Sequence, residues 1–184
     1  MKPVRREDLL DHVTYGERRD RLRESLMRAK ELRRVHVGEH LTFLFESTDT
    51  ILYQVQEMTR LEQIVRDKDI QHEIDTYNQL LGGPGELGCT LLIEIDDAVD
   101  RNAKLRSWLA LPQHLYLKLD DGSRAPAIWD AAQIGDTRLS SVQYLKFRVG
   151  SKRPVAIGST LPELPIEAEL SADQQRTLAA DLES

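Results

Sequence analysis

Several short segments alternate apolar and polar residues, and this alternation restricts the fold more than any other feature of the sequence. It occurs in residues 35–46, 114–119 and 141–149. Successive side chains of a β-strand point to opposite faces, so the alternation predicts strands with one buried face. Strands of this kind are typical of an antiparallel sheet whose second face carries polar residues.

Three further segments complete the predicted sheet. Residues 89–95 form a mostly apolar run, and residues 153–158 are expected to form an edge strand. The Asp-Gly turn within 120–123 predicts a hairpin that joins 114–119 to 124–130. We therefore expect an antiparallel or mixed sheet of about five or six strands.

Helical periodicity is found before, between and after these strands. Apolar residues recur every three or four positions in five segments, namely 16–34, 51–65, 69–81, 96–111 and 170–182. Ser171 and Gln174 have the spacing of a capping box at the start of the closing helix. The pattern predicts an α+β fold with helices packed mainly on one face of the sheet.

The 184 residues fit one domain, 1–184, because domains commonly contain about 100 to 200 residues. Within it, an Arg-rich helix is expected in 1–34, and a Pro-punctuated tail with the closing helix in 159–184. Residues 1–34 contain eleven Lys and Arg against seven Asp and Glu, whereas the whole chain has a net charge of −6. The acidic remainder argues against nucleic acid as a partner.

The single cysteine, Cys89, lies in an apolar run, so we expect a buried and unreactive thiol. The sequence contains no run of about 18 apolar residues, and its first residues lack the apolar core of a signal peptide. We therefore expect a cytoplasmic protein without a membrane-spanning segment.

The helix predicted at 51–65 has an unusual polar side. Tyr53, Glu57 and Arg60 follow one strip of it, and Gln56 lies on the adjacent strip. If this side is a site, Glu57 is the candidate acid, base or metal ligand and Arg60 the candidate anion clamp, with Gln54 and Gln56 orienting the ligand. The alternative is a solvated or intramolecularly hydrogen-bonded face.

The polar face of the predicted sheet supplies a second candidate surface. If the helix at 51–65 crosses that face, polar strand residues converge on Glu57; if it crosses the apolar face, they do not. The residues concerned are His40, Glu46, Tyr116, Lys118, Tyr144, Lys146 and Arg148. His40 and Glu57 form the candidate metal site, with a divalent metal as the candidate cofactor.

Three motifs connect the sequence with a known family. They are "RRV...G.H.T..FE" at 33–46, "YQ.QEM.R.E.I" at 53–64, and "E...YN.L" at 73–80, which is followed by "TLLIEI". Together they resemble a bacterial family known as domain of unknown function number thirty-five hundred and one. The matching positions are Arg33, Arg34, His40, Glu46, Tyr53, Gln54, Gln56, Glu57, Arg60, Glu62, Glu73, Tyr77 and Asn78.

This resemblance implies a role in bacterial redox chemistry or peroxide defence. Members of the family look like companions of rubrerythrin-type diiron proteins and of iron–sulfur oxidoreductase subunits, which are therefore the implied partners. A second copy of the chain, giving a homodimer, is a further candidate partner.

Two functional hypotheses and one structural interpretation follow. The first is an accessory or binding protein that holds a small ligand or a protein partner. Its candidate ligand-binding residues are Arg34, Glu46, Tyr53, Gln54, Gln56, Tyr77 and Asn78. The second is a small, metal-assisted enzyme that uses Glu57, Arg60 and His40. In the structural interpretation, the motif residues form a buried hydrogen-bond network instead of a site, because an unmatched buried donor costs about 1 to 3 kcal/mol.

Overall fold

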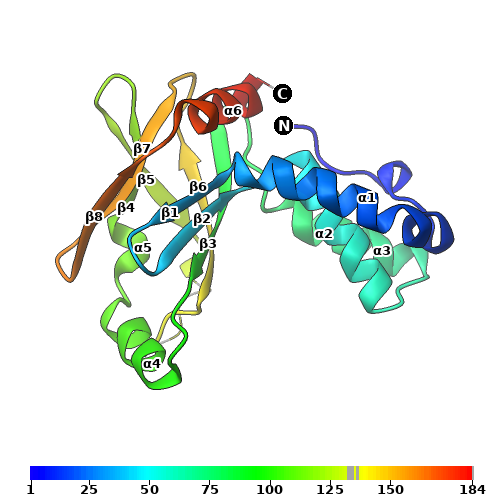
Figure 1. Ribbon diagram of the computed structural model, residues 1–184, viewed down its shortest axis with the longest axis horizontal. Coiled ribbons are helices and arrows are strands. Elements are labelled where there is room, and N and C mark those ends of the chain that lie inside the picture. The colour runs from blue at the N-terminus through cyan, green and yellow to red at the C-terminus, as the bar shows by residue number, and fades with distance from the viewer. Residues whose placement is uncertain (132–134, 136, 184) are drawn as a thin grey trace.

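The computed structural model describes residues 1–131, 135 and 137–183. It has two parts, a strongly curved β-sheet and a group of three helices that extends away from one side of it (Figure 1). The helices are α1 (His12–Glu31), α2 (Thr48–Leu61), α3 (Asp67–Asn78), α4 (Ala98–Ser107), α5 (Leu111–His114) and α6 (Ala172–Glu183), with a short 3-10 turn at Arg6–Asp8. The strands are β1 (Arg34–Val37), β2 (Leu41–Phe45), β3 (Glu86–Ile93), β4 (Leu115–Leu119), β5 (Arg124–Trp129), β6 (Val142–Arg148), β7 (Pro154–Leu161) and β8 (Leu164–Glu169).

The α+β class and the antiparallel sheet are confirmed, but the expected number of strands is too low. In the described part of the chain, eight strands pair in the order β1-β2-β3-β6-β5-β4-β7-β8, all antiparallel. The sheet curves until β8 lies beside β1, so it is nearly a barrel. The apolar residues of the alternating segments point inward and form the larger core.

Two errors in the sequence interpretation account for the missing strands. Residues 35–46 were expected to form one strand, whereas they form the hairpin β1–β2. Gly38, with φ of 63°, starts the turn, and Val37 pairs with Leu41 four positions later. Because four is an even number, the alternation continues across the turn and hides it. The other missed strand is β8, which lies in the Pro-punctuated tail and pairs with β7, so β7 is not the expected edge strand.

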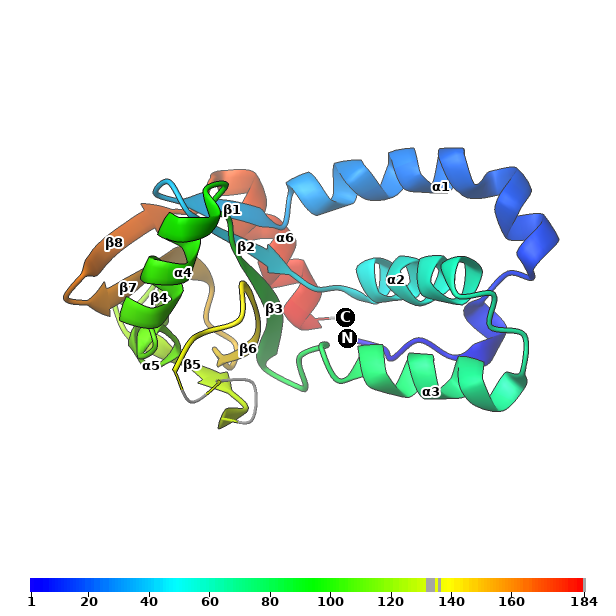
Figure 2. The same cartoon turned by 90° about the horizontal axis from the view of Figure 1, so that it is seen from below.

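The helices do not form one layer over one face of the sheet, contrary to expectation. Helix α6 packs against β3 and β7 and contributes Leu178 to the larger core, whereas α4 and α5 lie at the opposite end of the curved sheet. Helices α1, α2 and α3 lie side by side and form the helical lobe, beyond the ends of β2 and β3 (Figure 2). The helical lobe has its own apolar cluster, centred on Ile51, Val55 and Ile74.

Two smaller expectations about the chain are confirmed. Ser171 and Gln174 form the expected capping box, because Gln174 N donates to Ser171 Oγ at 3.2 Å and Ser171 N donates to Gln174 Oε1 at 2.8 Å. Cys89 is buried in β3, and burial raises the pKa of its thiol. None of the described helices is long and apolar enough to cross a bilayer.

The glycine-rich segment at 82–88 connects the helical lobe to β3. Gly85 has φ of 70°, which favours glycine, and the chain folds back tightly against the first residues of β3. A Cβ atom on Gly88 would lie 1.8 Å from the backbone oxygen of Leu80. This close approach of two backbones requires glycine and holds the end of α3 against the sheet.

We expect Gly88→Ala to destabilise the protein by more than about 2 kcal/mol, because the new methyl group meets backbone that cannot move aside cheaply. Gly16→Ala is the matched control, since a Cβ there meets nothing within 4 Å and alanine favours a helix interior by about 0.5 to 1 kcal/mol. Urea denaturation of both variants measures the two effects. Equal stability of the two variants would contradict the tight packing at Gly88.

Candidate functional site

The joint between the helical lobe and the sheet is built around the buried carboxylate of Glu46. Glu46 directly follows β2, and its backbone N–H donates to Gly88 O at 2.9 Å, so it continues the strand pairing with β3. Thr90 Oγ1 donates to Glu46 Oε1, and Thr50 Oγ1 donates to Glu46 Oε2, each at 2.6 Å. One carboxylate thus links the end of β2, the middle of β3 and the first turn of α2.

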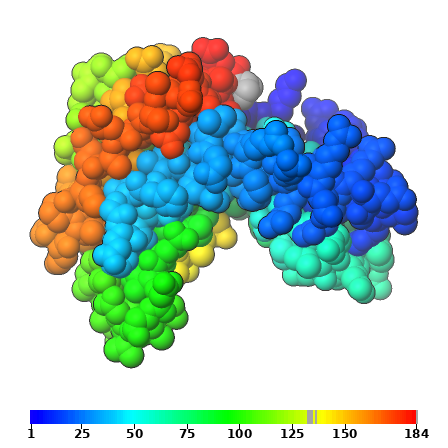
Figure 3. All heavy atoms as spheres, in the orientation of Figure 1, coloured from blue at the N-terminus to red at the C-terminus, as the bar shows by residue number. Residues whose placement is uncertain are grey.

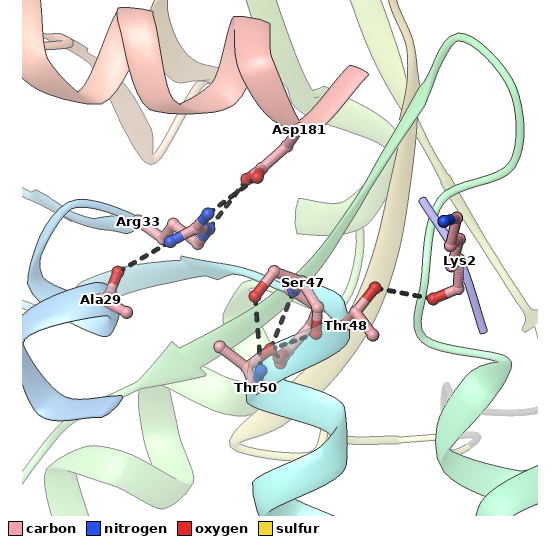
Figure 4. Close-up of polar contacts among 8 residues, drawn as sticks. Lys2, Ala29, Arg33, Ser47, Thr48, Thr50 and Asp181 are labelled. Carbon is pink, nitrogen blue, oxygen red and sulfur yellow. Dashed lines mark hydrogen bonds and ion pairs between the residues drawn. The ribbon is translucent and has the colours of Figure 1, made fainter. Parts of the chain in front are cut away.

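Ser47 is the N-cap of α2 at this joint. Ser47 Oγ accepts from Thr50 N at 3.3 Å, and Ser47 N donates to Thr50 Oγ1 at 2.9 Å (Figure 4). Thr48 Oγ1 in turn donates to the backbone oxygen of Lys2 at 2.6 Å. The reciprocal cap fixes Thr50, and with it the hydroxyl that meets Glu46.

A pocket of about 240 Å³, here called the junction pocket, opens beside this carboxylate. Three helices and three strands contribute to its wall. The lining residues are Lys30 from α1, Leu44 and Glu46 from β2 and its end, Thr50, Ile51 and Gln54 from α2, Tyr77 and Leu80 from the end of α3, Thr90 and Leu92 from β3, and Tyr144 from β6. The pocket therefore exists only when the helical lobe and the sheet are assembled.

Strand register explains why the strand residues of this wall meet. Thr90 pairs with Leu44 on one side and with Tyr144 on the other, so the three residues form one row across β2, β3 and β6. This row lies on the outward face of the sheet, because the alternate residues Cys89 and Leu145 belong to the larger core. The outward face was the expected second candidate surface.

Only part of that predicted surface converges, and it does so away from Glu57. Glu46 and Tyr144 meet Gln54 of α2 in the junction pocket. Tyr116 and Lys118 instead donate to Glu167 at 2.8 and 2.9 Å. Arg148 forms an ion pair with Glu86 at 2.9 Å, which joins β6 to β3. Helix α2 continues away from the end of β2 and does not cross the sheet (Figure 2).

The junction pocket contains groups of opposite charge and two phenols. Burial lowers the pKa of Lys30, and the nearby charge of Glu46 partly opposes this shift. The Lys30 ammonium lies 5.7 Å from the centre of the Tyr53 ring. Burial raises the pKa of Tyr144, with smaller contributions from Tyr77 and Glu46, so these three groups lie close to one another.

Some polar groups of the pocket have no hydrogen-bonding partner within the described part of the chain. The side chains of Lys30, Gln54 and Tyr77 line the pocket, and none of them makes a hydrogen bond or an ion pair with a described residue. All three are half-buried. Partly buried donors and acceptors of this kind are available to a ligand.

Two other predicted ligand-binding residues serve the structure instead, because they hold the N-terminal segment. Gln56 Oε1 accepts from Leu10 N at 2.9 Å, and Gln56 Nε2 donates to Leu10 O at 3.0 Å. The Asn78 side chain binds the backbone of Val4 in the same way. Asn78 Oδ1 accepts from Val4 N, and Asn78 Nδ2 donates to Val4 O, both at 2.9 Å. Each side-chain amide pairs with both the N–H and the C=O of one backbone residue, as a neighbouring β-strand would. The two amides hold the first ten residues against α2 and α3.

Glu57, the predicted catalytic acid, is engaged in a structural contact between α1 and α2. Its carboxylate accepts from Arg19 Nε at 2.8 Å, from Arg19 Nη2 at 2.7 Å and from the Tyr15 hydroxyl at 2.6 Å. The Arg19 hydrogen bond lowers the pKa of Glu57, and the Tyr15 hydrogen bond and the charge of Arg60 act in the same direction. Arg60 is half-buried on the same helix.

The motif arginines follow α1, with Arg33 in the turn after the helix and Arg34 as the first residue of β1. Arg33 Nε and Nη2 donate to the two carboxylate oxygens of Asp181 at 2.8 and 2.7 Å, and Arg33 Nη1 donates to Ala29 O at 3.1 Å (Figure 4). This pair ties α1 to α6. Arg34 forms an ion pair with Glu31 at 3.0 Å, and its charge acts on Lys30 at the edge of the junction pocket.

The structure does not bring the candidate metal ligands His40 and Glu57 together. His40 lies in the turn between β1 and β2, with Nε2 2.9 Å from Lys104 Nζ and its ring 5.9 Å from that of Trp108. Glu57 lies in the helical lobe beside Arg19. Within the described ranges, no group of three or more His, Cys, Asp or Glu side chains is arranged to hold a metal ion.

A second and larger hollow, of about 470 Å³, is the interhelical groove between α1, α2 and the N-terminal segment. Its wall is mostly apolar, with Leu22, Leu26 and Leu52 among its residues, and Tyr53 also contributes. Its buried polar groups, Tyr15 and Gln56, already bind protein partners. We therefore regard the smaller junction pocket, which combines both charges with available polar groups, as the candidate site.

Three polar members of the junction pocket were not recognised in the sequence, namely Lys30, Thr50 and Thr90. Lys30 is one of many basic residues in α1, and the two threonines stand in segments that were interpreted as a helix start and a buried strand. No local signal distinguishes them. Only the pairing of β3 with β2 and β6 brings Thr90 to Glu46 and Tyr144.

Comparisons with known proteins give a family and a fold. The family model described as "Protein of unknown function (DUF3501)" matches residues 3–182. A crystal structure of a protein of unknown function from Burkholderia pseudomallei K96243 is similar at 30% sequence identity and a TM-score of 0.90, covering 98% of this chain and 100% of that chain. No curated protein gives a significant match.

We expect Glu57→Gln to lower the free energy of unfolding at pH 7 by about 1 to 2 kcal/mol, because it removes a charge-assisted contact with Arg19. The folded protein holds the pKa of Glu57 below its usual value, so the contribution is complete above the unfolded pKa of about 4.3 and is lost as the pH falls further. Urea denaturation at pH 7 and at pH 3 to 4 measures it.

The control for this prediction is Glu62→Gln, at the exposed end of the same helix. We expect it to change stability by less than about 0.5 kcal/mol at either pH. A Glu57→Gln variant as stable as the wild type at pH 7 would contradict the structural role assigned to Glu57.

Proposed function

The chain belongs to the DUF3501 family of proteins of unknown function, and we propose that it is a binding protein that holds a small polar molecule in the junction pocket. The observation that carries this proposal is the convergence of Lys30, Glu46, Gln54 and Tyr77 from four separate segments around one hollow. Several of these groups have no hydrogen bond to the described residues, which is costly unless water or a ligand satisfies them.

Two further features support a ligand rather than solvent alone. The wall combines apolar side chains, such as Leu44 and Ile51, with a few polar groups, which is the usual composition of small-molecule sites. The pocket is also formed by both parts of the molecule, and binding sites commonly occur at such junctions. Candidate residues taken from the family motifs, Glu46, Gln54 and Tyr77, line it.

The redox association remains a prediction that rests on the resemblance to the family. A rubrerythrin-type or iron–sulfur protein is still the proposed partner, and a second copy of the chain is the alternative. The geometry does not favour the enzyme hypothesis in its original form, because Glu57 binds Arg19 while His40 contacts Lys104 and Trp108.

The test of ligand binding is to fill the junction pocket. We expect Gln54→Trp to block the pocket, because Gln54 lines it and an indole is much larger than the amide. The protein is dialysed to equilibrium against the small-molecule fraction of a bacterial extract, and mass spectrometry quantifies the molecules enriched with it. Enrichment of one class of small polar molecule is expected for the wild type and not for Gln54→Trp.

The matched control is Leu61→Trp, because Leu61 is 64% exposed on the same helix and lies outside the pocket. It should enrich the same molecules as the wild type, and circular dichroism establishes that both variants are folded. Enrichment by Gln54→Trp equal to that of the wild type, or no enrichment by the wild type, would refute the proposed site.

A further inference from the structure

The acidic end of the junction pocket is suited to an ammonium group. Glu46 is only 7% exposed, and two threonine hydroxyls donate to it at 2.6 Å each. A carboxylate has about four lone-pair positions, so about two remain for further donors. In the described part of the chain, no Lys, Arg or His nitrogen forms an ion pair with Glu46. Hydroxyl groups orient the carboxylate but carry no positive charge, and the charge of Lys30 acts on it without a direct ion pair. An ammonium group in contact with Glu46 would therefore pair its charge.

The basic end of the pocket is suited to an anionic group. Lys30 reaches it from α1, and its ammonium has three donors but no carboxylate partner among the described residues. The Lys30 ammonium lies over the Tyr53 ring, 5.7 Å from its centre, and this contact stabilises a cation without using its N–H donors. A carboxylate on a ligand would engage these donors directly.

Size and the remaining groups restrict the ligand further. A volume of about 240 Å³ corresponds to roughly eight water molecules at about 30 Å³ each, so a ligand of about that many non-hydrogen atoms fits. Tyr77 and Tyr144 offer aromatic rings beside Glu46, where they favour a cation, and the Gln54 amide can both donate and accept. Leu80 and Leu92 leave room for a short apolar part.

We propose that the junction pocket binds a small zwitterion of the α-amino acid class, with its ammonium group on Glu46 and its carboxylate on Lys30. This inference rests on the proposed function and gives its ligand a chemical class. The two charged ends belong to different parts of the molecule, since Lys30 is in the helical lobe and Glu46 ends a strand of the sheet. The ligand therefore bridges α1 and the end of β2.

Isothermal titration calorimetry with matched probes tests the two charges separately. The probes are the α-amino acids of up to eight non-hydrogen atoms, including alanine, serine and valine, each with its N-acetyl derivative and its primary amide. We expect at least one amino acid to bind, and its N-acetyl derivative and its amide each to bind roughly tenfold or more weakly, because each lacks one charge-assisted contact.

Two variants assign the ends of the ligand. Glu46→Gln should lower the affinity for the amino acid by roughly tenfold or more and change the affinity for its N-acetyl derivative little. Lys30→Met should lower the affinity for the amino acid by a similar factor and change the affinity for its primary amide little. Because Glu46→Gln also affects the α2 cap, Lys30→Met keeps the test valid if the first variant does not fold. Lys118→Met, at the Glu167 ion pair on another part of the sheet, should bind like the wild type.

The outcomes separate this inference from the proposed function. If an amino acid, its N-acetyl derivative and its primary amide bind with equal affinity, the zwitterion assignment is overturned. Failure of every amino acid to bind, while dialysis enriches another small molecule in a manner sensitive to Gln54→Trp, would also overturn it and leave the proposed function standing. If dialysis enriches nothing and no amino acid binds, both are refuted.

Discussion

The buried carboxylate of Glu46 is the contact on which the arrangement of the molecule depends. It accepts hydrogen bonds from the hydroxyl groups of Thr50 and Thr90, so it fixes the direction in which α2 leaves the sheet. From that direction follow the position of the helical lobe, the reach of Lys30 from α1 and the place of Tyr77 at the end of α3. Burying a carboxylate without hydrogen-bond donors would cost free energy. The two hydroxyl groups reduce this cost and use only part of the hydrogen-bonding capacity of the carboxylate. The space-filling view shows a broad hollow between α4 and the helical lobe, which is the visible result of this outward course (Figure 3).

The polar motif residues divide into two groups with different physical roles. Gln56, Asn78, Glu57 and Arg33 are saturated by protein partners and assemble the helical lobe, the N-terminal segment and α6. Glu46, Gln54 and Tyr77 are not saturated in this way and surround the junction pocket. Sequence motifs mark both groups alike, because buried networks and binding sites both require particular polar groups at fixed positions. Hydrogen-bond satisfaction in the structure is what separates them.

Sequence patterns predicted the fold class and most elements because these depend on local periodicity. Residues 141–149 were expected to form a strand with one buried face, and Leu145, Phe147 and Val149 on that face are buried. The capping box at Ser171 also formed as expected. The turn at Gly38 was missed because the hydrophobic alternation passes through it unchanged, and β8 was missed because Pro162 and Pro165 argued against a strand. Likewise, the sequence could predict only those residues of the site that belong to one helix, strand or motif. Lys30 and Thr90 enter it through strand pairing and helix packing, which no local pattern specifies.

The closure of the sheet has a consequence for how the chain reaches its native state. The contacts that bring the two ends of the chain together join residues far apart in sequence, since Arg33 and Asp181 are separated by 148 positions and Arg34 and Gln174 by 140. Loop-closure entropy opposes such contacts until much of the intervening chain is ordered, and proteins dominated by them fold slowly. The contacts between α1 and α2 are more local, with Arg19 and Glu57 only 38 positions apart. We therefore expect the helical lobe to assemble early in folding and the packing of β1 against β8 across the closure to come late.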